Sequence, residues 1–310
     1  MANYSIQDKV IKILKLGRFF FVFGGFFLYS IGALFAVLNG AELDIIKFLT
    51  GYMILFLGHL SVSYSNDYFD FDADSIGEKT NVSGGSGILQ LDPSLKETSK
   101  WIAVSLILCS IIIGTSFTLK YNYSPIFLCY IVFGNLLGWF YTAPPIRLSY
   151  RGLGEISTML AIGFVVPGMG YYVMKGLIDL NYIIFSIPLL LYGIYFILSV
   201  EIPDMETDII SGKKNFVTKN GRALSLKLIL LVTIISTSMY VIFQASELSD
   251  IGINFYMVAL LSIVPLTFAA LGLNNNTKEK SAEIAFNNLN ALILFAVLTN
   301  IYFLVRLIGF

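Results

Sequence analysis

The chain has 310 residues, of which 56% are hydrophobic and only 13% are charged, and its mean hydropathy is +0.78. Soluble domains usually hold about 25% charged residues, so this composition excludes a soluble globular protein and indicates a membrane protein. The net charge is +0, but the charges fall in short groups between long apolar segments. These groups predict the loops of a polytopic membrane protein.

Nine apolar segments are long enough to cross a bilayer, whose core of about 30 Å needs roughly 20 helical residues. Helices are expected because an open sheet leaves backbone groups without partners in lipid. We predict an all-α fold, a polytopic membrane helix bundle that forms one domain over residues 1–310. The nine predicted transmembrane helices cover residues 18–38, 45–65, 101–119, 124–143, 152–174, 181–200, 225–244, 251–272 and 285–308.

The basic residues predict the orientation of this bundle. If the N-terminus is cytoplasmic, 16 of the 20 Lys and Arg residues fall in cytoplasmic segments. The opposite side then keeps only Lys47, Lys120, Lys175 and Arg306. The positive-inside rule therefore predicts a cytoplasmic N-terminus. The basic start MANYSIQDKVIKILKLGR leads straight into the first span, so no cleavable signal peptide is expected.

A first acidic motif, NDYFDFDAD at residues 66–74, follows the second predicted span. It contains Asp67, Asp70, Asp72 and Asp74, and no Lys or Arg occurs between Phe48 and Glu78. On a helix the first, second and fourth of these aspartates share one face, whereas Asp72 points away. Converging carboxylates need a multivalent cation, and an all-oxygen set favours Mg²⁺ or Ca²⁺ over zinc. The alternative is an ordinary solvated helix end.

The glycine-rich segment SGGSG at residues 83–87 follows this motif. Its backbone N–H groups are able to approach a phosphate, but we favour its interpretation as a flexible turn.

A second acidic motif, EIPDMETD at residues 201–208, follows the sixth predicted span on the same side. Glu201, Asp204 and Asp208 share one helical face, and Glu206 points elsewhere. Two such motifs around one cavity would hold Mg²⁺ ions, which complete their coordination with water and substrate phosphate. The pair therefore indicates a diphosphate ligand. Basic residues on the same side would complete the site, or would only satisfy topology and anionic lipid: Arg18, Lys79, Arg147, Arg151, Lys213 and Lys214.

The single histidine and the two cysteines lie inside predicted spans. We interpret His59 as a buried histidine that hydrogen-bonds a neighbouring helix, with a catalytic role as the alternative. Cys109 and Cys129 have no metal-type spacing and are interpreted as small apolar residues.

The first motif resembles the NDxxDxxxD motif of the UbiA superfamily of intramembrane prenyltransferases, and DMETD resembles its second, DxxxD motif. Nine spans with both motifs cytoplasmic match as well. Several stretches are similar to the branch that contains the 1,4-dihydroxy-2-naphthoate prenyltransferases, which act in menaquinone biosynthesis. These stretches are YTAPPIRLSYRGLGE, GYYVMKG, EIPDMETDIISGKKNFVTKNG and SGGSG.

The resemblance implies a cell-membrane enzyme that uses Mg²⁺ to transfer a prenyl group from a polyprenyl diphosphate to a small aromatic acceptor. The implied metal ligands and catalytic residues are Asp67, Asp70, Asp74, Asp204 and Asp208. The implied substrate-binding residues are Arg18, Asn66, Tyr68, Lys79, Tyr141, Arg147 and Lys213. Aromatic faces would stabilise the allylic cation, and Tyr68, Phe140 and Tyr141 lie nearest the motifs.

Other functions remain as alternatives. In the first alternative, the enzyme transfers the prenyl group to a glycerol-phosphate ether lipid or to another ring-containing acceptor. An ion-coupled transporter also carries membrane carboxylates, but its sites usually lie near the midplane. The expected partners are the two substrates and the lipid bilayer, and no nucleic acid is expected.

Overall fold

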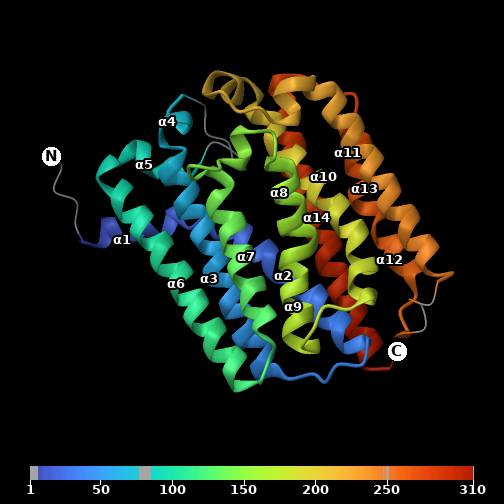
Figure 1. Ribbon diagram of the computed structural model, residues 1–310. Helices are drawn as coiled ribbons and strands as arrows, with labels where there is room; N and C mark the ends of the chain where they lie inside the picture. Colours follow the sequence, from blue (N-terminus) through green and yellow to red (C-terminus); the bar gives the residue numbers. More distant parts are fainter. Residues whose placement is uncertain (1–5, 77–84, 247, 249–250, 310) are drawn as a thin grey trace.

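The computed structural model describes residues 6–76, 85–246, 248 and 251–309, and all regular structure in these residues is helical (Figure 1). Nine of its helical segments are long and apolar enough to span a membrane, so the predicted all-α membrane bundle is confirmed. They cover Phe19–Leu38, Ile45–Phe69, Pro93–Lys120, Pro125–Thr142, Gly154–Lys175, Leu180–Ser211, Phe216–Phe243, Phe255–Gly272 and Lys278–Leu307.

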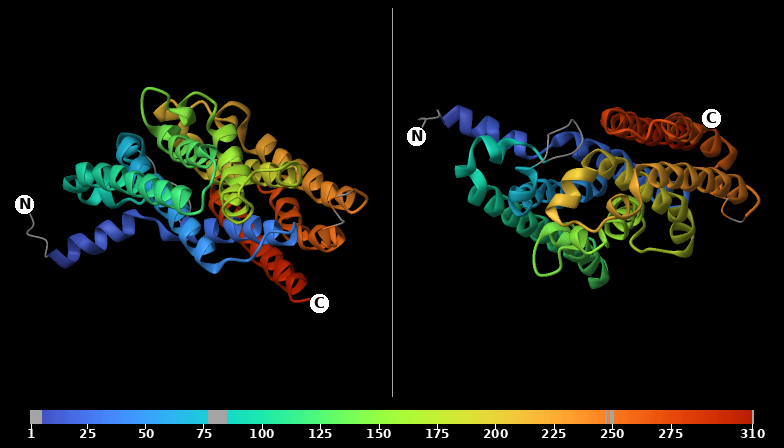
Figure 2. Two further views of the ribbon diagram at one scale, coloured as in Figure 1. Left: turned by 60° about the horizontal axis from the view of Figure 1, so that its bottom comes forward. Right: turned by 90° about the horizontal axis from the view of Figure 1, so that it is seen from above.

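The spans contain most of the helices that Figure 1 labels. These are α2 (Phe19–Leu38), α3 (Ile45–Phe69), α6 (Lys96–Lys120), α7 (Pro125–Thr142), α8 (Gly154–Leu160), α9 (Val166–Lys175), α10 (Leu180–Ser211), α11 (Phe216–Phe243), α12 (Phe255–Leu261), α13 (Ile263–Gly272) and α14 (Lys278–Leu307). The short elements are α4 (Phe71–Asp74), α5 (Ile88–Leu91), η1 (Pro93–Leu95), η2 (Leu148–Tyr150) and the π turn η3 (Ala161–Val165). Helix α1 (Ile6–Leu16) precedes the first span and projects from the side of the bundle (Figure 2).

Side-chain caps and turn residues fix several helix starts. Asp44 and Asp179 accept backbone N–H groups at the starts of α3 and α10, and Asn215 does the same for α11. Ser124 caps α7, whose first residue is Pro125. Both α3 and α10 continue beyond the apolar segments predicted at residues 45–65 and 181–200. The acidic motifs therefore lie at the C-terminal ends of these two helices.

The core lies between α2, α9, α10 and α14, where apolar side chains fill the bundle. Phe35 of α2 and Phe185 of α10 stack with ring centroids 4.0 Å apart. The α2 and α9 backbones approach so closely that a Cβ on Gly32 would overlap the carbonyl oxygen of Pro167. A Cβ on Gly170 would likewise overlap that of Tyr29. Glycine is therefore required on both sides of this helix contact.

Cys109 and Cys129 are exposed on the outer faces of α6 and α7. This location agrees with their interpretation as apolar residues on lipid-facing helices.

Candidate active site

The first acidic motif lies where α3 gives way to α4. The helix does not run straight through it, because Asp70 has φ −93° and ψ 9° and separates the two helices. The motif is therefore not one regular helix, although the expected separation of Asp72 from the other aspartates is seen. Asp67 and Asp70 are nevertheless buried, with 3% and 7% exposure, whereas Asp72 is exposed. Asp67 and Asp70 thus point into the bundle, whereas Asp72 lies on its surface.

The described part of the glycine-rich segment, residues 85–87, packs against these carboxylates. The Ser86 backbone N–H lies 3.2 Å from both Asp67 carboxylate oxygens, and the Ser86 hydroxyl donates to Asp67 Oδ2. Gly85 has φ +65°, and a Cβ there would overlap the Asp74 carboxylate. The interpretation as a flexible turn missed this fixed position beside the motif.

The second acidic motif lies on the last turns of α10, which continues to Ser211. Glu201 and Asp208 are buried and Asp204 is half-buried. Glu201 Oε2 has no hydrogen-bond partner in the part of the chain that the structure describes. Glu206 points elsewhere, as the spacing predicts, and accepts a hydrogen bond of 2.7 Å from Arg222 Nη1. The inward face of the motif therefore carries Glu201 and Asp208, with the half-buried Asp204 between them.

Lys213 joins the two acidic motifs. Its Nζ lies 3.3 Å from Asp70 Oδ2 and 3.3 Å from Asp208 Oδ1. Burial lowers the pKa of this ammonium, but the two carboxylates more than offset burial and hold it well above its usual value. Asn215 Nδ2 also donates to Asp208 Oδ2 at 2.7 Å. The two motifs, far apart in sequence, thus meet at one end of the bundle (Figure 1).

The carboxylates of the first motif lie close enough to repel one another. Burial, together with the neighbouring charges of Asp70 and Asp67, raises the pKa of Asp74 to about 7. No three His, Cys, Asp or Glu side chains of the described residues gather closely enough to hold a metal alone. Mg²⁺, however, is usually held by one or two carboxylates together with phosphate oxygens and water. The all-oxygen donor set of the motifs therefore fits Mg²⁺.

Two arginines in left-handed backbone conformations border the cluster. Arg18 has φ +45° between α1 and α2, and its charge acts on Asp74. Arg147 has φ +49° and stacks 3.8 Å over the ring of Tyr150, whose hydroxyl donates to Asp70 Oδ1 at 2.8 Å. Tyr150 was missed from the sequence, where its only signal is its place in the basic YTAPPIRLSYRGLGE loop.

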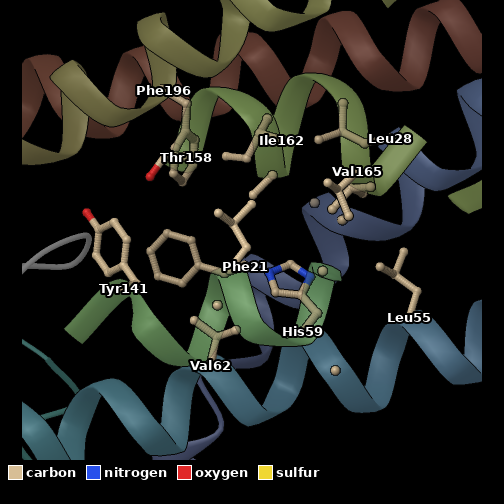
Figure 3. Close-up of a pocket in the computed structure, with 18 of the residues that line it drawn as sticks. Phe21, Leu28, Leu55, His59, Val62, Tyr141, Thr158, Ile162, Val165 and Phe196 are labelled. Atoms are coloured by element: carbon tan, nitrogen blue, oxygen red, sulfur yellow. The ribbon is translucent and has the colours of Figure 1, made fainter. Parts of the chain in front are cut away.

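A cavity of about 330 Å³ opens beneath the cluster. Arg18, Asn66 and Tyr141 line its polar end, and Thr142 Oγ1 donates to Asn66 Oδ1 at 2.9 Å. Most of the remaining lining is apolar, and Figure 3 shows Tyr141 and Thr158 at one end with apolar side chains further in. The arrangement suits a molecule with a charged head and a hydrocarbon tail.

Three residues singled out from the sequence lie elsewhere or differ in their contacts. The Tyr68 hydroxyl donates to Glu97 at 3.2 Å, and its ring lies 5.2 Å from Lys100 Nζ, so Tyr68 faces α6. Lys79 lies outside the described residues. His59 points into the cavity (Figure 3). Within the described chain its ring has no hydrogen-bond partner, so the expected bond to a neighbouring helix is wrong.

Solved structures of UbiA homologues share this fold. One from Archaeoglobus fulgidus, bound to DMAPP and Mg²⁺, has a TM-score of 0.71 at 16% identity and covers 96% of this chain and 100% of its own. An apo homologue from Aeropyrum pernix K1 has a TM-score of 0.63 at 14% identity, with coverages of 89% and 98%. A structure of digeranylgeranylglyceryl phosphate synthase has a TM-score of 0.60 at 19% identity, with coverages of 94% and 99%. These identities show the fold alone.

No curated protein sequence matches the chain. The family model of the UbiA prenyltransferases, in contrast, matches residues 25–297. That range contains both acidic motifs, the Lys213 bridge and most of the cavity lining. Members of this family are intramembrane prenyltransferases, which confirms the expectation of a membrane-embedded transferase. The chain belongs to the UbiA prenyltransferase family.

Proposed function

We propose that the protein transfers a prenyl group from a polyprenyl diphosphate to an aromatic quinone precursor, as the resemblance to the 1,4-dihydroxy-2-naphthoate prenyltransferases implies. The observation that carries this proposal is the meeting of two buried acidic motifs above an apolar cavity. A homologue with the same fold is bound to DMAPP and Mg²⁺, and another structure to GPP and Mg²⁺, which supports both the donor class and the metal.

The proposed site divides its residues between metal, diphosphate and prenyl chain. The metal-holding residues are Asp67, Asp70, Asp74, Asp204 and Asp208. Mg²⁺ bound there would neutralise the diphosphate and stabilise it as a leaving group. The groups placed to contact the diphosphate or to border it are Arg18, Asn66, Arg147 and Lys213, with Lys79 as a further sequence-based candidate. Tyr68 is left out because its hydroxyl faces Glu97.

The reaction breaks the bond between the prenyl C1 and the diphosphate oxygen, and the diphosphate leaves with the electron pair. Aromatic faces stabilise an allylic cation, and Phe21 and Tyr141 line the cavity next to the polar end (Figure 3). A nucleophilic ring carbon of the acceptor then forms the new bond and loses its proton. The apolar lining keeps water away from the cation, which would otherwise be hydrolysed.

The second candidate acceptor is a glycerol-phosphate ether lipid. The shared fold with digeranylgeranylglyceryl phosphate synthase favours it as the alternative. Both candidates use the same donor chemistry, so the proposed metal and diphosphate residues are the same for each.

A single experiment tests the function and separates the acceptors. The purified protein would be incubated with geranylgeranyl diphosphate and either 1,4-dihydroxy-2-naphthoate or geranylgeranylglyceryl phosphate, with product masses as the readout. We expect a prenylated naphthoate in Mg²⁺ and none in EDTA. A product formed only with the glycerol lipid would show that this lipid, and not the naphthoate, is the acceptor. Full transfer in EDTA would contradict the proposed metal site.

We also propose that the acidic end of the bundle faces the cytoplasm of a cell membrane, since 16 of the 20 Lys and Arg residues fall on the expected inner side. A cysteine introduced at Ser211, in a background without Cys109 and Cys129, should react with an impermeant reagent only from the cytoplasmic side. Reaction from the outer side would reverse the orientation.

A further inference from the structure

One wall of the cavity is built by the stretch from α8 to α9, which the π turn η3 interrupts. An α-helix turns by about 100° per residue, so residues four apart drift by about 40° around its axis. A π turn takes an extra residue per turn and reduces that drift. Its presence keeps side chains that recur every four residues on the cavity side of this stretch. These are Ser157, Thr158, Ala161, Ile162, Val165, Val166 and Met169. Figure 3 shows Ile162 and Val165 pointing inward.

Two tyrosines from other helices hold this turn by its backbone. The Tyr130 hydroxyl, from α7, lies 3.0 Å from the carbonyl oxygens of both Phe164 and Val165. The Tyr182 hydroxyl, from α10, donates to the Phe164 carbonyl at 2.6 Å. Both phenols therefore converge on the end of the π turn.

The local sequence leaves room for this convergence. Pro167 has no backbone N–H, so one bond of the regular helical ladder is missing just after the turn. A Cβ on Gly168 would overlap the Tyr130 hydroxyl and would lie 2.8 Å from the Tyr182 hydroxyl. The absence of a side chain at Gly168 therefore explains why two external donors fit here.

We propose that Tyr130 and Tyr182 are positioning residues that fix the π turn and, through it, the shape of the wall along which a prenyl chain lies. This inference rests on the proposed function. A hydrocarbon chain offers no hydrogen-bonding groups, so the cavity recognises it only by shape and apolar contact. A wall that changes register therefore changes chain binding while the diphosphate contacts at the acidic motifs stay in place.

The test compares a double variant, Tyr130→Phe with Tyr182→Phe, with the control Tyr123→Phe. The Tyr123 hydroxyl also donates to a backbone carbonyl of α9, at 2.7 Å from Val173 O. Tyr123 and Tyr182 do not line the cavity, whereas Tyr130 does, so Tyr182→Phe alone is measured as well to separate the turn from direct contact. Binding of the non-reactive geranylgeranyl thiodiphosphate and of inorganic pyrophosphate would be measured with Mg²⁺. The double variant should bind the prenyl analogue about tenfold more weakly, as expected for two lost hydrogen bonds, with pyrophosphate binding unchanged.

The control variant should bind both ligands as the wild type does. Hydrogen exchange of the amides in residues 161–170 should be faster in the double variant than in the control. Unchanged binding of the prenyl analogue, or an equal loss in Tyr123→Phe, would overturn the inference. If the double variant fails to fold, each single substitution is measured against the same control. A wild-type protein that binds pyrophosphate but not the prenyl analogue would reject the proposed donor, and the exchange rates would still decide whether the tyrosines hold the turn.

Discussion

The two acidic motifs reach the same site by different structural routes. The first is broken at Asp70 and depends on distant groups, since Ser86 holds Asp67 and Tyr150 holds Asp70. The second lies on one continuous helix, and Asp208 is held by Asn215 just after that helix ends. Lys213 is the link between them. The difference teaches that the second motif is organised locally, whereas the first requires the folded bundle around it.

The strongest test of this comparison removes one carboxylate from each motif. Asp70→Asn and Asp208→Asn should each lower prenyl-transfer turnover at least about a hundredfold, because each removes a charge that stabilises the bound metal and the leaving group. Pyrophosphate release at saturating substrate measures the effect. Melting temperature serves as the folding control. Near wild-type turnover in Asp208→Asn would show that the motifs do not act as one site.

Removing the Lys213 charge should leave the carboxylates of the two motifs to repel each other. Lys213→Met leaves Asp70 and Asp208 facing each other without their shared cation, and breaking a buried ion pair costs about 3–5 kcal/mol. We expect a lower melting temperature without Mg²⁺ and a larger stabilisation by added Mg²⁺ than in the wild type. Lys214→Met, at the exposed neighbouring position, is the control. Equal Mg²⁺ responses of the two variants would argue against the bridge.

A smaller effect is expected from the backbone support of the first motif. Gly85 and Gly212 both have positive φ, +65° and +78°, so an alanine strains the backbone at either position. Only at Gly85 would the added Cβ also overlap a carboxylate, that of Asp74, whereas Gly212 has open space. Gly85→Ala should therefore weaken Mg²⁺ binding about tenfold by calorimetry, and Gly212→Ala should not. Similar affinities would mean that residues 85–87 do not shape the site.

The smallest effects on turnover are expected from the acidic residues that point away. Asp72→Asn and Glu206→Gln should each stay within about twofold of wild-type turnover, since neither removes a proposed metal ligand. Glu206→Gln should still lower the melting temperature slightly, because it removes the charge that pairs with Arg222, and a partly exposed ion pair contributes about 0.2–1 kcal/mol. A hundredfold loss in either variant would require a different set of ligands.

The sequence was sufficient to predict the nine spans, because hydropathy directly reports which segments tolerate lipid. It predicted their ends less well. The second and sixth spans continue to Phe69 and Ser211, since a helix persists beyond the membrane core once its polar residues find partners. The break at Asp70 depends on the surrounding fold and has no glycine or proline to mark it.

Most of the acidic site was visible as residue spacing, but its partners were not. Lys213 was a candidate from the sequence, but its contact with Asp70 is tertiary, as are the contacts of Ser86 and Tyr150 with the aspartates, and no local pattern encodes them. Tyr68 illustrates the converse, because closeness in sequence to the motif does not fix the direction of a side chain.

The contact of α2 with α9 also limits how the bundle moves. Because Gly32 and Gly170 bring backbone directly against backbone, no side chain there is able to rotate and let the two helices slide. We therefore expect α2 and α9 to behave as one rigid body. Any widening of the cavity should then come from its other walls, on α3, α7, α8, α10 or α14.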